Sequence, residues 1–225
     1  MVWAGEQKGA CALTKSPNSD DGISAEDIVL DTILTRHSVS PKRVQSPGPT
    51  RAQIDKLMEA AGAAPDHGKL RPWRFIDFPQ ATRAALADVF EAALRERLPN
   101  ADSEALSRAR EKASRAPVLL GLVLRLNYHS DIPHMDDQIA SGGAALQNLL
   151  LAVHAMGFGA RALSGQAVRT QVFRRALGLS DEETFLCFIT IGTPSTAPKR
   201  RDRPGPGDLL STWVPAGPDA GKEAS

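Results

Sequence analysis

Residues 136–165, DDQIASGGAALQNLLLAVHAMGFGARALSG, decide the fold of this chain. Apolar residues surround most of the helical circumference in the first part of the stretch, which predicts one long helix over 137–156. The residues that follow predict a strand over 157–163. Each glycine weakens a helix by about 1 kcal/mol, so Gly142-Gly143 predicts close approach of another helix or of a ligand. A helix this apolar is unfavourable with one face in water, so we expect it to pack across a dimer axis.

Further strands and helices are expected on both sides of this stretch. Residues 117–126 form a near-continuous apolar run, typical of a strand buried on both faces. Ser24 and Thr50 begin helices, because each can accept hydrogen bonds from free backbone N–H groups three residues later. The other predicted strands are 73–78 and 184–192, and the other predicted helices are 80–97, 103–114 and 168–178. This mixed order indicates an α+β or α/β fold around a central sheet.

The length of 225 residues fits one domain with tails. Residues 1–23 and 215–225 are polar and show no periodicity, so we expect two flexible tails around one domain over 24–214. The chain is 42% apolar and 24% charged, close to an ordinary soluble domain. A core of this size needs neither disulfides nor a structural metal.

Charge and cysteine content exclude several functional classes. The net charge of +1 gives no reason to expect a nucleic-acid partner. No apolar run approaches the ~20 residues that span a bilayer, and the N-terminus does not resemble a signal peptide. Cys11 and Cys187 lie in a polar tail and an apolar run, and we expect both to be unpaired. A cytoplasmic protein is therefore expected.

Three basic clusters could bind a ligand. Arg36-His37-Ser38 combines a permanent charge, forked donors and a hydroxyl, although cations are also favoured at any helix C-terminus. The loop at 64–71 brings His67 and Lys69 between a predicted helix and a predicted strand, where ligand contacts are common. Residues 199–203, KRRDR, could clamp a phosphate or form a solvated turn.

Other chemistries find no support in the sequence. There is no Gly-x-x-x-x-Gly-Lys-Ser/Thr loop for nucleotide phosphates, and Ser164 is not in a Gly-x-Ser-x-Gly elbow. His129 and His134 are five residues apart with Pro133 between them, so they do not share a helical face. We therefore expect no metal site.

Taken in order, five segments of the chain resemble the nitroreductase family of flavoproteins, most of all its compact bacterial members. The segments are ILTRHSV (33–39), LMEAAGAAPDHGKLRPWRF (57–75), SRAPVLLGLVL (114–124), residues 136–165 quoted above, and IGTPSTAPKRRDRP (191–204). The resemblance covers about residues 26–214. It implies an α+β fold with a central, mostly antiparallel sheet wrapped by helices, and an interlocked homodimer with two FMN sites at its interface.

The resemblance also implies the chemistry and the site. Hydride would pass from NADH or NADPH to FMN, and then to an electron-poor small molecule such as a nitroaromatic or a quinone. FMN would carry this chemistry, so no catalytic side chain is expected. Residues matching the family's cofactor contacts are Arg36, His37, Ser38, His67, Lys69, Ala162, Leu163, Ser164, Lys199 and Arg201. Of these, His67 would reach the FMN of the partner subunit.

The chain departs from the family pattern at several of these positions. His37 stands where the family has Arg, and Ala63 stands where close relatives often have Arg. Ala162-Leu163 replaces a Trp-Arg pair, which leaves mainly backbone contacts to the flavin ring. Two alternatives stay open: a specialised flavoenzyme of the same fold (a dehydrogenase, a dehalogenase or a flavin-degrading enzyme), with residues 95–115 as its lid, and a flavin-binding protein with little turnover.

Overall fold

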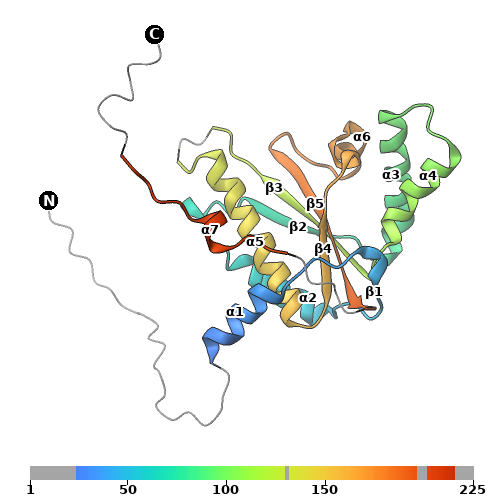
Figure 1. Ribbon diagram of the computed structural model, residues 1–225. Helices are drawn as coiled ribbons and strands as arrows, with labels where there is room; N and C mark the ends of the chain where they lie inside the picture. The colour runs from blue at the N-terminus through green and yellow to red at the C-terminus, as the bar shows by residue number, and fades with distance from the viewer. Residues whose placement is uncertain (1–23, 130–131, 197–201, 216–225) are drawn as a thin grey trace.

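The computed structural model describes residues 24–129, 132–196 and 202–215. At its centre is an antiparallel sheet in which the strands follow the order β1-β5-β3-β2, with β4 also paired to β5 (Figure 1). The strands are β1 (Val44–Gln45), β2 (Trp73–Asp77), β3 (Val118–Arg125), β4 (Gly159–Leu163) and β5 (Glu183–Pro194). The predicted α+β fold with an antiparallel sheet is confirmed, and the α/β alternative is excluded.

Helices surround the sheet close to their predicted positions. They are α1 (Ala25–Thr35), α2 (Arg51–Gly62), α3 (Arg83–Arg97), α4 (Ser103–Arg110), α5 (Met135–Ala155), α6 (Gln171–Ala176) and α7 (Pro206–Leu209). Both predicted caps are present: Ser24 Oγ accepts from the backbone N–H of Asp27 at 3.0 Å, and Thr50 Oγ1 from that of Gln53 at 3.3 Å. Among the described residues, no helix has the length and hydrophobicity needed to cross a membrane.

Two predicted helices are shorter than expected, and two segments with no predicted element form a strand and a helix. The predicted helix 103–114 ends at Arg110 and continues as a 3-10 turn, Glu111–Ser114, and the predicted helix 168–178 contains only α6, after a 3-10 turn at Gln166–Arg169. The short strand β1 and helix α7 were not predicted. Three further 3-10 turns lie at Pro41–Arg43, His67–Lys69 and Gln80–Thr82.

Alternating side chains of the sheet build two cores on its opposite faces. Leu120, Leu122 and Leu124 of β3 face α2 and α5, whereas Leu119 and Val123 face α3, α4 and the α6 region. The pairing of β3 with β5 shifts between Leu122 and Val123, where β5 carries one extra residue. Because of this bulge, both Phe185 and Phe188 point into the second core.

The glycine pair of α5 has one packing role and one open position. A Cβ on Gly142 would collide with the side chain of Leu124 on β3, whereas a Cβ on Gly143 would have no neighbour within 4 Å. The predicted close approach at Gly142 is therefore present, but the neighbour is a strand of the sheet rather than a helix or a ligand. Gly143 lies on the exposed face of α5.

Gly121 on β3 provides a test of this packing. A Cβ there would lie 2.6 Å from one ring atom of Phe185 and 3.0 Å from the ring of Phe78. Both rings are buried and cannot move away, so we expect Gly121→Ala to lower the free energy of unfolding by about 1–3 kcal/mol. Gly62→Ala is the control, because nothing lies within 4 Å of that position and alanine favours helix. Chemical denaturation of both variants measures the difference, and equal stabilities would contradict the packing described.

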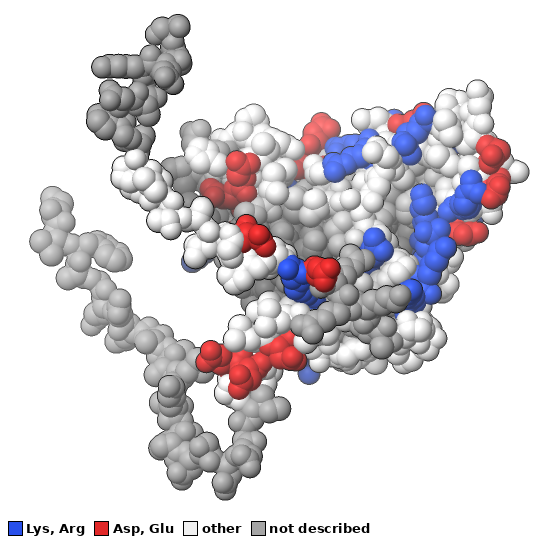
Figure 2. All heavy atoms as spheres, viewed as in Figure 1, with Lys and Arg blue, Asp and Glu red and all other residues white. Residues whose placement is uncertain are grey.

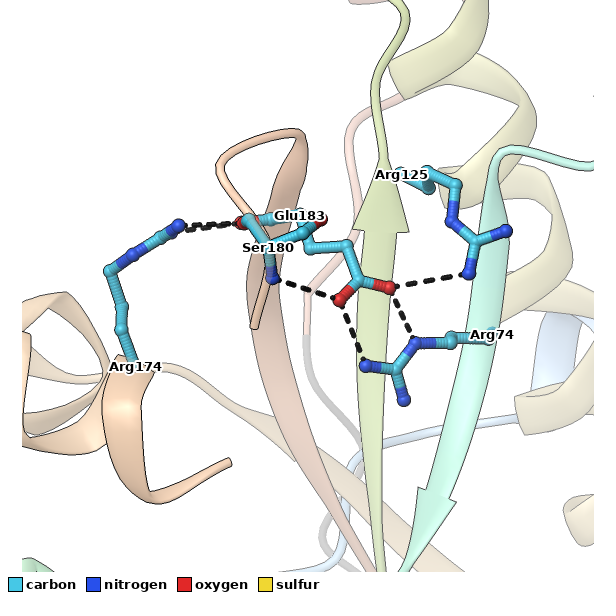
Figure 3. A network of polar contacts seen from close by, with 5 residues as sticks. All are labelled: Arg74, Arg125, Arg174, Ser180 and Glu183. Atoms are coloured by element: carbon cyan, nitrogen blue, oxygen red, sulfur yellow. Dashed lines mark hydrogen bonds and ion pairs between the residues drawn. The ribbon is translucent and has the colours of Figure 1, made fainter. Parts of the chain in front are cut away.

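The buried carboxylate of Glu183, at the start of β5, links this strand to β2 and β3 (Figure 3). Arg74 of β2 donates two hydrogen bonds to Glu183, at 2.7 and 3.1 Å, and Arg125 of β3 donates a longer one at 3.5 Å. Ser180 N–H donates to the same carboxylate at 3.3 Å, and Arg174 of α6 donates to the Glu183 carbonyl at 2.8 Å. The Arg74 hydrogen bonds, followed by the Ser180 N–H and the charges of Arg74 and Arg125, lower the pKa of Glu183 to about 2, although burial opposes them.

Helix α1 has no fully buried residue in the single chain, and it projects away from the sheet (Figure 1). Its apolar side chains Ile28, Val29, Leu30, Ile33 and Leu34 are 40–62% exposed. The C-terminal segment is similar, since Leu209, Leu210, Trp213 and Val214 are 74–81% exposed. Apolar surface of this extent is characteristic of a surface that another molecule covers.

Candidate functional site

A polar cluster joins the C-terminal ends of α1 and α5. It consists of Thr35, Arg36, His37, His154 and Arg203, and is called the Arg36 cluster below. Thr35 Oγ1 lies 2.9 Å from His154 Nε2, and the His37 and His154 rings meet edge to face at 5.9 Å. Arg203 Nη2 donates to the Arg36 carbonyl at 2.5 Å. The cluster therefore brings together residues from α1, α5 and the C-terminal segment.

The hydrogen-bond geometry shows which atom is the donor in the contacts that His154 and His37 make with Thr35. Thr35 Oγ1 donates its own hydrogen to the Asp31 carbonyl at 2.6 Å, so it must accept from His154 Nε2–H. Burial, His37 and Arg36 lower the pKa of His154, so this ring is neutral near pH 7. His37 Nδ1 lies 2.7 Å from the Thr35 carbonyl, which can only accept, so that nitrogen carries hydrogen.

The two guanidinium groups of the cluster form a cationic site. Burial, followed by the nearby charge of Arg203, lowers the pKa of Arg36. Among the described residues, neither guanidinium has a carboxylate within ion-pair distance. Asp31 of α1 lies near enough to act on the pKa of His154 but forms no described ion pair with either guanidinium. The other acidic residues of α1, Glu26 and Asp27, lie in its first turn, and acidic side chains gather over this helix (Figure 2). Two cations held together with no ion-pair partner among the described residues favour an anionic ligand.

Strand β4 lies directly beside this cluster. The backbone N–H of Val39 donates to the Ala160 carbonyl at 2.9 Å, which attaches the segment after α1 to the strand. The contact depends on Gly159, because a Cβ there would lie 2.8 Å from the Val39 side chain. Ala162 lies two residues further along the strand, about 7 Å from Ala160.

The predicted contacts at 162–164 do not share one face. Ala162 packs with the core on the α5 side, whereas Leu163 packs with the core on the α3 side. Ser164 follows the strand and is exposed. A ligand on the α5 side could therefore contact Leu163 only through its backbone.

His67 and Lys69 lie at the other end of α5. Their 3-10 turn is exposed, and His67 Nδ1 is 3.9 Å from Asp137 Oδ2 in the first turn of α5. Gly68, Lys69 and Arg71 have positive φ angles of 76°, 55° and 48°. For the two non-glycine residues this backbone is strained, and such strain is concentrated in binding loops.

The length of α5 separates the two predicted halves of the site. Asp137 beside His67 and His154 beside Arg36 are 17 residues apart, which corresponds to about 25 Å along a helix. Arg36, His37 and Ser38 lie together beside β4, whereas His67 and Lys69 do not join them within one chain. Ala63 is exposed at the C-terminal end of α2.

Lys199 and Arg201 lie outside the described residues. The described residues on either side are Ser195, whose backbone N–H donates to the Arg43 carbonyl at 2.8 Å, and Arg203, which contacts Arg36. Arg203 belongs to the basic segment found in the sequence but was not among the predicted contacts. Nothing local in the sequence distinguished it from the other cations of that segment.

The sequence model of the nitroreductase family matches residues 33–193, from the end of α1 to the end of β5. The chain belongs to the nitroreductase family. It is 32% identical over 173 residues to a Haemophilus influenzae protein named "Putative NAD(P)H nitroreductase", covering 76% of this chain and 92% of that protein.

Solved nitroreductase-like structures share the fold. A nitroreductase-like family protein from Bacillus cereus superimposes with a TM-score of 0.72 at 18% identity, over 87% of this chain and 99% of the other. A Desulfovibrio desulfuricans protein described as a nitroreductase in complex with FMN gives a TM-score of 0.62 at 24% identity, over 83% and 98% of the two chains. The nitroreductase fold predicted from the five sequence segments is thus confirmed.

Proposed function

We propose that this nitroreductase-family chain is an FMN-dependent oxidoreductase. It would take hydride from NADH or NADPH and pass it to an electron-poor small molecule such as a nitroaromatic or a quinone. The Arg36 cluster carries this proposal, because it presents two cations without a described counter-charge beside β4. The Haemophilus relative named for NAD(P)H and the FMN-bound Desulfovibrio structure support the choice of cofactors.

The residues present fit FMN. Its phosphate carries nearly two negative charges, which Arg36 and Arg203 would neutralise together with Lys199 and Arg201 of the same basic segment. Ser38 would add a hydroxyl donor, and Ala162, Leu163 and Ser164 would border the ring. Bound FMN would supply the hydride chemistry, and the chain would orient it and exclude water.

We infer that the complete site needs two chains. A distance of about 25 Å along α5 exceeds the length of FMN, so His67 and Lys69 would come from the partner of the chain that supplies Arg36. The exposed apolar side chains of α1 and of residues 209–214 would be buried in the same homodimer. Sedimentation at micromolar concentration should then show a dimer, and a stable 24.1 kDa monomer would contradict this.

The packing of residues 95–115 in the second core tests the alternative of a specialised flavoenzyme in which this segment is a lid. Residues 95–115 include α4 and the turn after it, which bury Leu106, Ala109 and Ala113. Arg110 is also paired with Asp88 and Glu91 of α3, at 2.6 and 2.7 Å. A segment fixed in this way on the sheet face opposite α5 favours a general reductase over an enzyme with a closing lid.

The purified protein provides the test. We expect it to be yellow, and we expect the flavin absorbance to bleach under anaerobic mixing with NADH or NADPH. Stopped-flow reduction with each nucleotide would also show which one is preferred. A yellow protein that neither nucleotide bleaches would support the alternatives, and a protein that does not bind added FMN would overturn the proposal.

We place the reaction in the cytoplasm, where buried Cys187 would remain reduced.

His37 allows a gain-of-affinity experiment. Arginine carries a permanent charge and a forked set of donors, which histidine lacks. His37→Arg should therefore tighten FMN binding at pH 8 by about fivefold, or about 1 kcal/mol. His37→Gln is the control, because it keeps a polar side chain without a charge. Fluorescence titration of each apo-protein with FMN measures the two dissociation constants. Equal affinities for the two variants would show that residue 37 does not interact with the phosphate.

A further inference from the structure

The N-terminal end of α5 holds a polar network that the proposed function does not use. Gln138 is only 1% exposed, and its side chain joins two segments before the helix. Its Oε1 accepts from Asn127 N–H at 2.8 Å, and its Nε2 donates to the carbonyls of Asn127 and Pro133 at 3.1 and 3.2 Å. The start of α5 is therefore held firmly to the end of β3.

Asp137 lies one residue before Gln138 and connects this network to the His67 loop. Its Oδ2 accepts from the His134 backbone N–H at 3.1 Å, which holds the carboxylate in place at the helix start. The same oxygen is 3.9 Å from His67 Nδ1, which is within ion-pair distance but beyond a hydrogen bond, and both side chains are partly exposed. The carboxylate thus faces one specific nitrogen of the imidazole ring.

The loop that carries His67 is held in a matching way. Asp66 Oδ2 accepts from the Arg71 backbone N–H at 2.8 Å, across the positive-φ residues of the turn. A Cβ on Gly68 would lie 3.0 Å from Pro133, so the turn also lies against the segment that Gln138 fixes. Both members of the His67–Asp137 pair therefore stand on fixed backbone.

We propose that Asp137 is a positioning residue for His67. The negative charge of the carboxylate favours hydrogen on the ring nitrogen that faces it, Nδ1, which would leave Nε2 to face the cofactor. The inference rests on the proposed function, in which His67 contacts the FMN held by the partner chain. Asp137 would fix the orientation of the ring without touching FMN itself.

The first test uses two neighbouring carboxylates. Asp137→Asn keeps an acceptor for His134 N–H but loses the charge beside His67, and it should weaken FMN binding about threefold to tenfold. Asp136→Asn removes the same charge from the same helical turn, without a described contact to His67, and should leave binding unchanged. Equal losses in both variants would overturn the inference, because a general charge effect would then explain them.

The second test asks whether Asp137 acts through His67. In a His67→Ala background, Asp137→Asn should cause no further loss of FMN affinity. Nitrogen-15 NMR of the histidine rings in the apo-protein should show His67 with hydrogen on Nδ1, and a shift toward the other form in Asp137→Asn only. An additive loss in the double variant, or unchanged ring spectra, would overturn the inference. Failure of wild-type protein to bind FMN would instead overturn the proposed function as well.

Discussion

Arg36→Ala should weaken FMN binding more than any other single change in the proposed site. A hydrogen bond to a charged group contributes about 1.5–3 kcal/mol, which corresponds to a loss of about tenfold to 150-fold in affinity. The described contacts of Arg36 to other residues use its backbone, so the apo-protein should keep its melting temperature. Equilibrium titration of apo-protein with FMN gives the affinity, and calorimetry gives the stability.

A control for net charge is available on the opposite face of the sheet. Arg97 lies in the last turn of α3 and is exposed, so Arg97→Ala removes one positive charge far from the Arg36 cluster. Its FMN affinity should match that of the wild type. Arg203→Ala should act in the same direction as Arg36→Ala. Unchanged affinity in both the Arg36 and the Arg203 variants would mean that the phosphate is bound elsewhere.

Glu183→Ala should destabilise the fold more than Gly121→Ala or any change in the proposed site. It leaves Arg74 and the Ser180 N–H without their shared acceptor. The Arg74 side chain is 35% exposed, so water can solvate its charge, and the loss of several hydrogen bonds to one carboxylate should cost about 3 kcal/mol. For a chain of this length, that loss lowers the melting temperature by about 6–12 °C. Glu182→Ala is the matched control, because the neighbouring carboxylate is exposed. Similar melting temperatures for the two variants would contradict the role of the network.

The same network predicts a pH dependence of stability. The pKa of Glu183 is about 2 in the folded chain and 4.5 in its ordinary state, so the folded state favours the charged form. Its stabilisation is therefore complete above about pH 5 and is lost as the pH falls from about 4.5 to about 2. The difference in unfolding free energy between wild type and Glu183→Ala should shrink over that interval. A difference that stays constant down to pH 2 would exclude this cause.

Local interactions explain why most elements could be predicted from the sequence. The caps at Ser24 and Thr50 form between residues three apart, and the apolar run of β3 identifies a strand buried on both faces. The two-residue strand β1 has no such signal, because its strand partner is the end of β5, about 150 residues later in the chain. The Arg74–Glu183 ion pair could not be predicted for the same reason, because its two residues are 109 positions apart in the sequence.

Residues of the candidate site could be predicted from the sequence only where the residue type and the family pattern agreed. Arg36 stood out as a permanent cation in a matching segment, and the structure adds its neighbour Arg203, 167 residues away. His154 is different, because a lone histidine in an apolar helix gives no sign that Thr35 and His37 will meet it. The positive-φ backbone at Lys69 and Arg71 likewise has no residue signature, since neither is glycine.

The span of α5 has a genetic consequence if each cofactor is shared between chains. Arg36→Ala and His67→Ala would damage opposite ends of the same helix, and every site in either pure dimer would lack one contact. In a mixed dimer, one site would receive both altered residues and the other would receive neither. Co-expression of the two defective alleles should therefore restore function by intragenic complementation, whereas two alleles altered at the same end of α5 should never rescue each other.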